Sequence, residues 1–279
     1  MQKSFKKALF VILAVSFLIT TPSIILYSQG YRFDFEQKKL VQTGAFYFKT
    51  RPDNAEVFVS GKPKKKTSFL FGNALIENLL PKNYEIEIQK EGYFPWKKNL
   101  PIKEKMVTEI KNIVLFPENP EFSLLDENGK EFWFSLLEKE KSNNGTTKKI
   151  KDAKTKDILD EAKGFMFSPD NKKVAYFNDY EIWLYFLEED LGQPRHEAKE
   201  KVFLTRFSEK IGNVFWADNY YLLFNAGDKI KISETDTRDG LNIIDLTEFK
   251  DPKIFFSQGD NRLYVLSEGK VFASKKLLP

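Results

Sequence analysis

The sequence predicts a mainly β protein attached to one N-terminal transmembrane helix. Aromatic residues make up 15% of the 279 residues, and aromatic and β-branched side chains favour pleated sheets. Alternation of apolar and polar residues with a period of two recurs after residue 43, as half-buried strands require. Ala8–Ser28 is instead continuously apolar and uncharged. We therefore expect four parts: an anchor (1–30), a juxtamembrane segment (31–43), a small β-sandwich (44–117) and repeated antiparallel sheets (118–279).

The composition restricts the possible functions. A net charge of +4 from 44 basic and 40 acidic residues is a mixed surface, unlike the one-signed field of nucleic-acid-binding proteins. The absence of cysteine excludes disulfides, cysteine nucleophiles and thiolate metal sites. The single histidine, His196, lies in the charged run R-H-E-A-K-E-K, where we expect a solvated side chain. We expect no cofactor, no metal and no nucleic-acid partner.

The apolar segment predicts a retained membrane anchor. Its 21 residues at about 1.5 Å per residue match the ~30 Å hydrocarbon core. A cleaved signal peptide is the alternative, but the run is long and no A-x-A-like site follows it. Lys3, Lys6 and Lys7 precede it closely, without acidic residues among them. Three basic residues, Arg32, Lys38 and Lys39, also follow the apolar segment closely enough to count for orientation. Because the lysines before the segment lie nearer to it, we expect a single-pass cell-membrane protein with a cytoplasmic N-terminus and an extracytoplasmic body.

The segment after residue 43 predicts a small sandwich. In 83–89, N-Y-E-I-E-I-Q, the apolar residues Tyr84, Ile86 and Ile88 alternate with polar ones. Further strands are expected over 44–49, 55–60 and 107–115, separated by proline-containing turns.

This segment resembles the PEGA family. The motifs are "RPDNAEVFVSGK" (51–62), "NLLPKNYEIEIQKEGYFPW" (78–96) and "IVLFP" (113–117). Two positions depart from the family pattern, both at turns: Lys82 replaces a glycine, and Thr67-Ser68 replaces threonine-proline. The resemblance implies a β-sandwich of the kind found beside transmembrane segments in bacterial and archaeal envelope proteins. It also implies a structural or interaction role without catalytic residues.

Two groups in this segment are candidate ligand-binding residues. The lysine run suggests contact with an anionic wall polymer or phospholipid headgroups, and a solvated hairpin loop is the alternative. The aromatic cluster of Tyr93, Phe94 and Trp96 suggests a sugar-stacking platform, and core packing at the sandwich edge is the alternative. The candidates are Lys62, Lys64, Lys65 and Lys66, together with Tyr93 and Trp96.

Three later stretches read as copies of one unit. They are 164–187, 213–236 and 253–277, and their starts lie 49 and 40 residues apart. This spacing is that of propeller blades, roughly 40–50 residues of four short strands each. Glu121–Leu137 is a hairpin candidate for a fourth, partial unit.

The first copy resembles TolB-like and WD-repeat propeller blades. The matching residues are "FSPDNKKVAY" (167–176) followed by "EIWLY" (181–185). Asn171 stands where the family has glycine, and asparagine also adopts the left-handed turn conformation. About 160 residues give three to four blades, at or below the usual lower limit for a closed propeller. Either the ring is small and incomplete, or it borrows strands from elsewhere, or an open stack of sheets closes with a partner chain by self-association. Two polar stretches interrupt the repeats: Glu138–Lys163, with a short helix near 155–162, and a loop over Asp190–Lys201.

The sequence contains no recognisable catalytic constellation. Asp236–Gly240 is similar to a calcium loop, but Arg238 occupies a position that needs an oxygen ligand. We expect a non-catalytic interaction or structural protein of the cell envelope. Its partners are the bilayer through residues 8–28 and a cell-wall polymer or envelope protein. The alternative is a glycan or peptide hydrolase with carboxylates in a propeller-like cleft.

Overall fold

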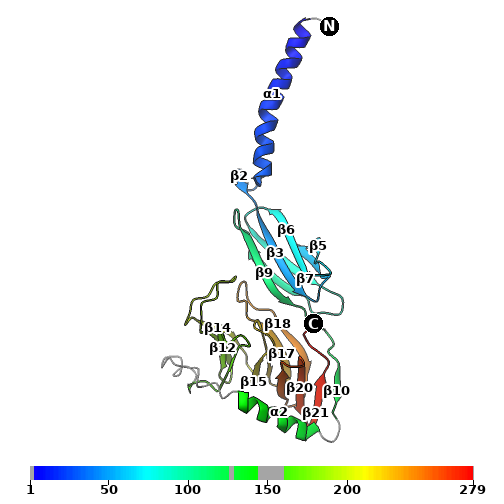
Figure 1. The fold of residues 1–279 in the computed structure, drawn as a ribbon, viewed down its shortest axis with the longest axis vertical. Coiled ribbons are helices and arrows are strands. Elements are labelled where there is room, and N and C mark those ends of the chain that lie inside the picture. Colours follow the sequence, from blue (N-terminus) through cyan, green and yellow to red (C-terminus); the bar gives the residue numbers. More distant parts are fainter. Residues whose placement is uncertain (1–2, 126–128, 144–159, 279) are drawn as a thin grey trace.

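The computed structural model describes residues 3–125, 129–143 and 160–278. One long helix, α1, stands out from a body made of several sheets (Figure 1). These sheets are antiparallel except for one parallel strand pair. The prediction of a mainly β protein with an N-terminal apolar helix is confirmed at this level.

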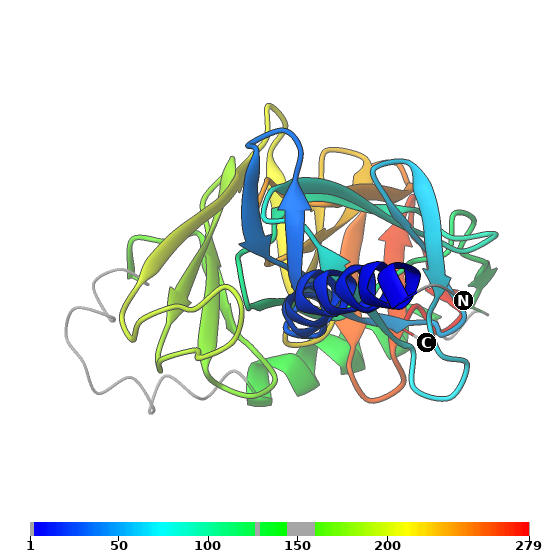
Figure 2. The same ribbon diagram turned by 90° about the horizontal axis from the view of Figure 1, so that it is seen from above.

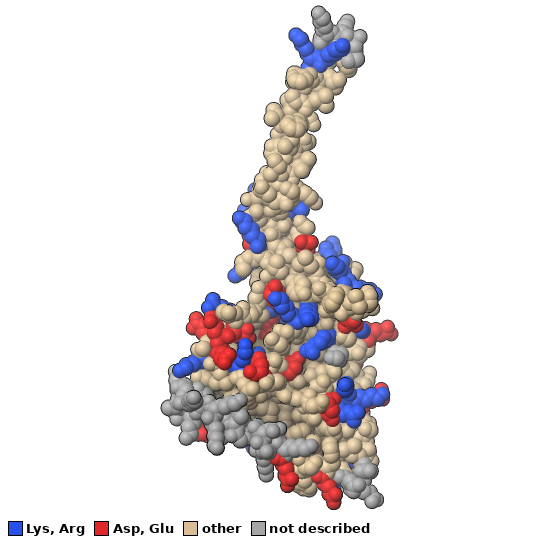
Figure 3. All heavy atoms as spheres, viewed as in Figure 1, with Lys and Arg blue, Asp and Glu red and all other residues tan. Residues whose placement is uncertain are grey.

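Helix α1 (Lys3–Ser28) is long and apolar enough to cross a membrane. Within Phe5–Ser28, the most apolar window of 18 residues has a mean hydropathy of 2.5, and none of that window is buried in the body. Figure 3 shows its uncharged surface between the lysines at its start and the body. Near Pro22, the hydroxyls of Thr20 and Ser23 each donate to a backbone carbonyl four residues earlier. The helix is therefore compatible with membrane anchoring.

A two-stranded hairpin follows the helix where the sequence predicted only a connecting segment. It consists of β1 (Tyr31–Asp34) and β2 (Lys39–Gln42), paired antiparallel. The guanidinium of Arg32 lies 3.5 Å from the centroid of the Tyr27 ring at the end of the helix. Its Nη2 donates to Oδ1 of Asn78 in the sandwich at 2.7 Å. Arg32 thus connects the helix, the hairpin and the sandwich.

Two sheets form the sandwich, in the orders β6-β3-β9 and β5-β4-β7-β8. Strands β3 and β9 are parallel, and the other pairs are antiparallel. The predicted strands over 44–49, 55–60, 83–89 and 107–115 are confirmed. The observed strands are β3 (Gly44–Arg51), β4 (Glu56–Val59), β5 (Lys62–Lys66), β6 (Asn73–Leu79), β7 (Asn83–Gln89), β8 (Trp96–Pro101) and β9 (Val107–Val114).

The core of the sandwich follows from the period of two. Ile86 and Ile88 of β7 point inward and are fully buried, as are Phe46 and Phe48 of the facing strand β3. Each such side chain contributes roughly 1.5–3 kcal/mol on burial. Local alternation therefore explains why both sheets pack on one face.

Three four-stranded antiparallel sheets form the rest of the body. The predicted copies each supply three consecutive strands, and a fourth strand completes each sheet. The first sheet has β11 (Gly164–Phe167), β12 (Lys173–Phe177), β13 (Glu181–Phe186) and β14 (Lys201–Arg206). The second has β15 (Ile211–Trp216), β16 (Tyr221–Ala226), β17 (Lys229–Glu234) and β18 (Ile243–Glu248). The third has β19 (Lys253–Ser257), β20 (Arg262–Ser267), β21 (Lys270–Ser274) and β10 (Phe122–Leu124), which pairs with β21.

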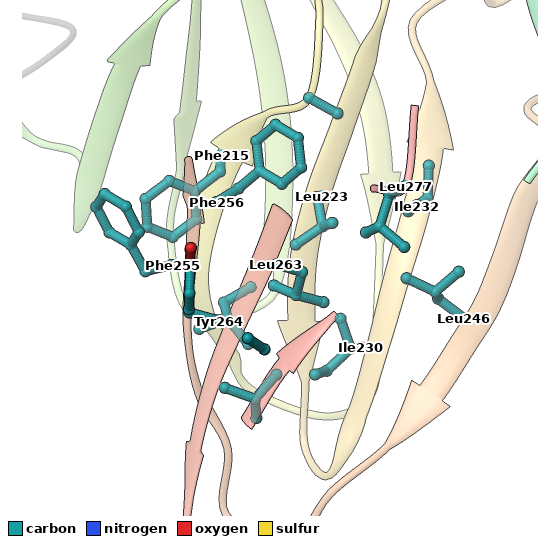
Figure 4. Packing of buried hydrophobic residues seen from close by; sticks show 14 of the residues in the cluster. Phe215, Leu223, Ile230, Ile232, Leu246, Phe255, Phe256, Leu263, Tyr264 and Leu277 are labelled. Atoms are coloured by element: carbon teal, nitrogen blue, oxygen red, sulfur yellow. The ribbon is translucent and has the colours of Figure 1, made fainter. Parts of the chain in front are cut away.

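These C-terminal sheets pack through their first strands. Strand β15 contacts both β11 and β19, and Figure 2 shows the first and third sheets on opposite sides of the body. The second and third sheets share a core that includes Leu223, Ile232, Phe256 and Leu263 (Figure 4). The described packing joins the first sheet to the second and the second to the third. This arrangement does not by itself make a closed ring of sheets, so a propeller stays a prediction.

Helix α2 (Gly129–Asn143) corrects the expected hairpin over Glu121–Leu137. Only β10 is a strand there. Trp133 and Leu136, one helical turn apart, are buried in the core of the C-terminal sheets, whereas Phe134 is 63% exposed. Spacing by three places both buried side chains on one helix face, which alternation in a strand would not. Most of the helix expected near 155–162 lies outside the described residues, and Asp190–Lys201 is mainly a loop, as predicted.

Candidate functional site

The predicted lysine run forms β5, which we call the basic strand. It is the edge strand of its sheet, pairs with β4 and exposes all of its residues. Lys66 forms an ion pair with Glu56 at 2.9 Å. Figure 3 shows basic side chains gathered over its position. Lysine and proline on an edge strand prevent further strand pairing, and they also leave a positively charged surface available to a partner.

An apolar loop next to the basic strand was not predicted. Phe69, Leu70 and Phe71, which we call the apolar tip, are 71%, 66% and 70% exposed. Exposed apolar patches of this kind mark interaction sites more often than isolated exposed residues do. The local signal was a run of three large apolar residues between a polar turn and a glycine.

The base of the apolar tip is held by backbone hydrogen bonds. Gly72 N donates to Ser68 O at 2.8 Å, and Ser68 N donates to Asn73 O at 2.8 Å. Thr50 N donates to Gly72 O at 2.8 Å. Gly72 has φ +63°, and a Cβ there would lie 2.2 Å from Thr50 O. This closed base forces the tip outward, at the end of β3 that is farther from α1.

The predicted aromatic pair does not form a surface platform. Trp96 is only 3% exposed, so its ring faces are not available to a sugar; this part of the prediction is wrong. Its indole Nε1 donates to Oε2 of Glu234 at 2.8 Å. Tyr93 is half-buried against the sandwich core, with Lys90 Nζ 5.9 Å from its ring centroid. Tyr93 and Lys66 line one surface groove, whereas Trp96 lies inside the contact with the C-terminal sheets.

A buried ion pair lies at this contact, which we call the junction. Lys98 Nζ is 2.8 Å from Oε1 of Glu234, and the two side chains are 1% and 5% exposed. Lys98 also donates to backbone carbonyls of the loop that resembled a calcium site, at Asp236 (2.7 Å), Arg238 (2.6 Å) and Gly240. The carbonyls that suggested a cation loop thus surround an ammonium group of the protein itself.

Glu234 has four donors around a buried carboxylate. Besides Lys98 and Trp96, the backbone and side-chain nitrogens of Asn242 each donate to Oε1 at 2.8 Å. Burial raises the pKa of Glu234, and the Lys98 ammonium and these hydrogen bonds oppose the rise. A buried charge needs such partners to be tolerated.

Two side-chain amides bind the outer edges of the sandwich. Asn242 accepts from Lys97 N at 3.1 Å and donates to Lys97 O at 3.0 Å, on edge strand β8. Gln193 accepts from Glu109 N at 3.0 Å and donates to Val107 O at 3.2 Å, on edge strand β9. Each amide pairs with a strand edge as a neighbouring strand would. The junction therefore fixes both sheets of the sandwich.

His196 is not solvated, contrary to the sequence-based prediction. It is 9% exposed, and its ring stacks on Phe186 with centroids 4.1 Å apart. Its Nδ1 lies 3.1 Å from Oε2 of Glu200 without forming a hydrogen bond. The charged sequence around it gave no signal of this burial, because the ring packs on a strand ten residues away.

Comparison with known proteins identifies no family for this chain. No protein-family model and no curated protein sequence matches it. Hsv2 from Kluyvelomyces marxianus aligns at 9% identity and a TM-score of 0.18, over 40% of this chain and 50% of Hsv2. A protein of unknown function from Bacteroides fragilis aligns at 11% identity and a TM-score of 0.18, over 84% of this chain and 96% of that protein. The PEGA and TolB-like resemblances therefore stay predictions.

Proposed function

We propose that this chain is a membrane-anchored, extracytoplasmic interaction protein of the cell envelope. The single observation behind the proposal is that the 24-residue span Phe5–Ser28 of α1 is apolar enough to cross a membrane, and its most apolar window has no cover from the body. Such a surface is stable in a bilayer and not in water. Exposed Phe33, Phe35 and Leu40 on the hairpin at the foot of the helix are suited to the membrane interface, where aromatic side chains gather.

The basic strand and the apolar tip are the proposed contact surface. They adjoin in sequence and combine positive charge with exposed aromatic rings. The tip lies at the end of β3 away from α1, so this surface is directed at a partner other than the bilayer that holds the helix. An envelope polymer or protein with anionic groups fits this chemistry.

The proposal assigns the body to the outer side of the membrane. Its support is the group of lysines Lys3, Lys6 and Lys7 at the start of α1, since basic residues favour the cytoplasmic side. A hydrolase would need two carboxylates facing one cleft, one with a raised pKa. Among the described carboxylates, Glu234 is the one with a raised pKa, and it is fully engaged at the junction, so it favours no catalytic role.

Protease accessibility tests the proposal. The full chain, tagged at its C-terminus in a bacterial host, is treated with protease in intact cells, in spheroplasts and after lysis. We expect digestion before lysis, in spheroplasts or already in intact cells, of a membrane-bound chain with its full mass. A matched variant with Leu13→Lys and Phe17→Lys should leave the membrane fraction, because two charges in the apolar segment oppose insertion. Protection until lysis would place the body in the cytoplasm and refute the envelope role.

A further inference from the structure

A cavity lies where the sandwich meets the first two C-terminal sheets. Its volume is about 100 Å³, enough for a small anion but smaller than the site of a drug-sized ligand. Its walls come from 110–113 of β9, the loop 190–196, and the segment 234–238 at the end of β17. Lys173, Phe186, Tyr220 and Tyr221 complete it. We call it the junction cavity.

Lys173 is the unusual residue of this cavity. It is the first residue of β12 and is 4% exposed. Neighbouring side chains of a strand point to opposite faces, so the preceding Lys172 is exposed while Lys173 points inward. The turn before the strand fixes this position, since Lys173 N donates to Oγ of Ser168 at 3.0 Å.

The ammonium group of Lys173 has aromatic neighbours and no acceptor. Its Nζ lies 4.8 Å from the ring centroid of Tyr220, 5.8 Å from that of Trp216 and 6.0 Å from that of Phe186. It forms no hydrogen bond or ion pair with any residue within the described parts of the chain. Burial lowers the pKa of Lys173, as the desolvation of a cation does.

The nearby carboxylates have other partners. Asp170, Asp190 and Asp218 lie close enough to oppose the lowering of the Lys173 pKa, but none of them forms an ion pair with it. Their partners are Ser168 Oγ at 2.6 Å, Gly192 N at 2.9 Å and Arg51 Nη2 at 2.7 Å, respectively. Asp190 itself lines the cavity, together with Glu234 and Asp236, which pair with Lys98 and Arg238. The carboxylates thus act on the Lys173 ammonium only from a distance, and none of them makes a direct ionic contact with it.

We propose that the junction cavity binds a small anion, a carboxylate or a phosphate group, with Lys173 as its charge partner. A buried cation costs free energy unless an anion or acceptors compensate it. The cavity has room for such a group, and Lys173 is the lining cation without a protein partner among the described residues. The buried ring of His196 stacks on Phe186 beside it and supplies a second polar edge.

Anion titration of the full chain in neutral detergent micelles tests this site. Sodium phosphate and sodium acetate are each titrated at constant ionic strength, with binding followed by calorimetry and by the shift in Tm. We expect saturable 1:1 binding of at least one anion with a Kd of about 1 mM or tighter. Binding of phosphate alone identifies a phosphoryl ligand, and binding of acetate alone identifies a carboxylate ligand. Failure of both to bind overturns the proposal.

Two single substitutions distinguish anion binding at Lys173 from a general effect of surface charge. Lys173→Met should weaken binding by about tenfold or more, because a charge-assisted contact is lost. Lys172→Met removes the same charge from the adjacent exposed side chain and should change the Kd by less than about twofold. Equal affinity of wild type and Lys173→Met would refute the site.

A measurement on the unsubstituted chain covers the case in which Lys173→Met does not fold. After lysine ammonium groups are labelled for NMR, the Lys173 signal should shift as the bound anion saturates, while the Lys172 signal stays unchanged. A Lys173 signal that stays unchanged at saturation would also refute the proposal. Membrane anchoring through α1 does not depend on this outcome.

Discussion

Lys98 and Lys173 are two buried lysines with opposite surroundings. Four oxygens surround the ammonium group of Lys98, whereas three aromatic rings surround that of Lys173. The first arrangement satisfies the charge within the protein and holds two parts of the body together. The second leaves the charge open to a ligand. The same residue type therefore has a structural role in one place and a proposed binding role in the other.

Tyr264 gives a residue-scale prediction for stability at alkaline pH. Its hydroxyl donates to Oδ2 of Asp260 at 2.6 Å. Burial and this hydrogen bond raise the pKa of Tyr264 from 10.0 to about 12. Below pH 10 both the folded and the unfolded chain hold the proton. As the pH rises through 12 the unfolded chain loses it first, so stability falls in this window.

The stability advantage of wild type over Tyr264→Phe should therefore decrease by about 2 kcal/mol between about pH 9 and pH 12, at roughly 1.4 kcal/mol per unit of pKa. Urea unfolding at each pH measures it. Tyr180→Phe, at a tyrosine 42% exposed, is the matched control. A difference between wild type and Tyr264→Phe that stays constant over this range would contradict the prediction.

Residue burial at the junction was only partly predictable. In β8, Trp96, Lys98 and Leu100 alternate with exposed residues, so a lysine on the apolar face was visible as a signal in the sequence. Its partner Glu234 lies 136 positions later, and no local pattern connects them. The burial of Trp96 and His196 was likewise not predictable, because it depends on contacts that form only in the folded chain.

At the scale of elements, strands with a clear period of two were predictable, whereas the β1–β2 hairpin and helix α2 were not. Strand β7 has a strict period of two over seven residues, which a helix cannot satisfy on one face. In α2 the run F-W-F-S-L-L would give an apolar face either as a strand or as a helix. Its periodicity therefore does not distinguish the two structures. The helix is favoured because it lets Trp133 and Leu136 pack together on the C-terminal sheets.

The basic strand gives a prediction at the element scale. The double variant Lys64→Gln/Lys65→Gln should lose retention of the full chain on a poly(glycerol phosphate) resin, because each lysine lost removes one attraction to the polymer. Retention should also decrease as salt rises, since exposed charges are screened. The double variant Lys103→Gln/Lys105→Gln removes the same charge from another exposed turn and serves as the control.

Elution of both double variants at the same salt concentration would mean that only net charge matters, and would contradict a specific role of β5. The apolar tip is tested in the same assay by Phe69→Ser and Phe71→Ser. Both side chains are exposed, so the substitutions should reduce retention without lowering Tm.

At the scale of the whole molecule, the junction makes one body of the sandwich and the C-terminal sheets. Its contacts include the Lys98–Glu234 pair, the amides of Asn242 and Gln193 on the two sandwich edges, and the Arg51–Asp218 pair at 2.7 Å. Arg32 in turn connects the sandwich with α1. A continuous series of contacts therefore connects the apolar helix α1 with the junction cavity.

Lys98→Ala should uncouple the unfolding of the sandwich from that of the C-terminal sheets. It leaves Glu234 buried without its cation, which costs about 3–5 kcal/mol for a buried pair. Because the lost contact joins two parts, each with its own core, we expect thermal unfolding to separate into two transitions. Limited proteolysis should also begin in the connection 117–121. Lys97→Ala, which removes the neighbouring lysine from an exposed pair with Glu87 at 2.8 Å, should leave a single transition.

A second variant distinguishes loss of the charge pair from loss of packing. In Lys98→Met/Glu234→Leu both charges are replaced by apolar side chains of similar size, and such replacements of buried pairs are often neutral or stabilising. If the pair acts mainly by preventing an unpaired charge, this variant should restore the single transition that Lys98→Ala loses. If two transitions persist, the directional hydrogen bonds from Lys98 to the carbonyls of 236–240 hold the junction. A single transition in Lys98→Ala itself would show that the junction does not depend on this lysine.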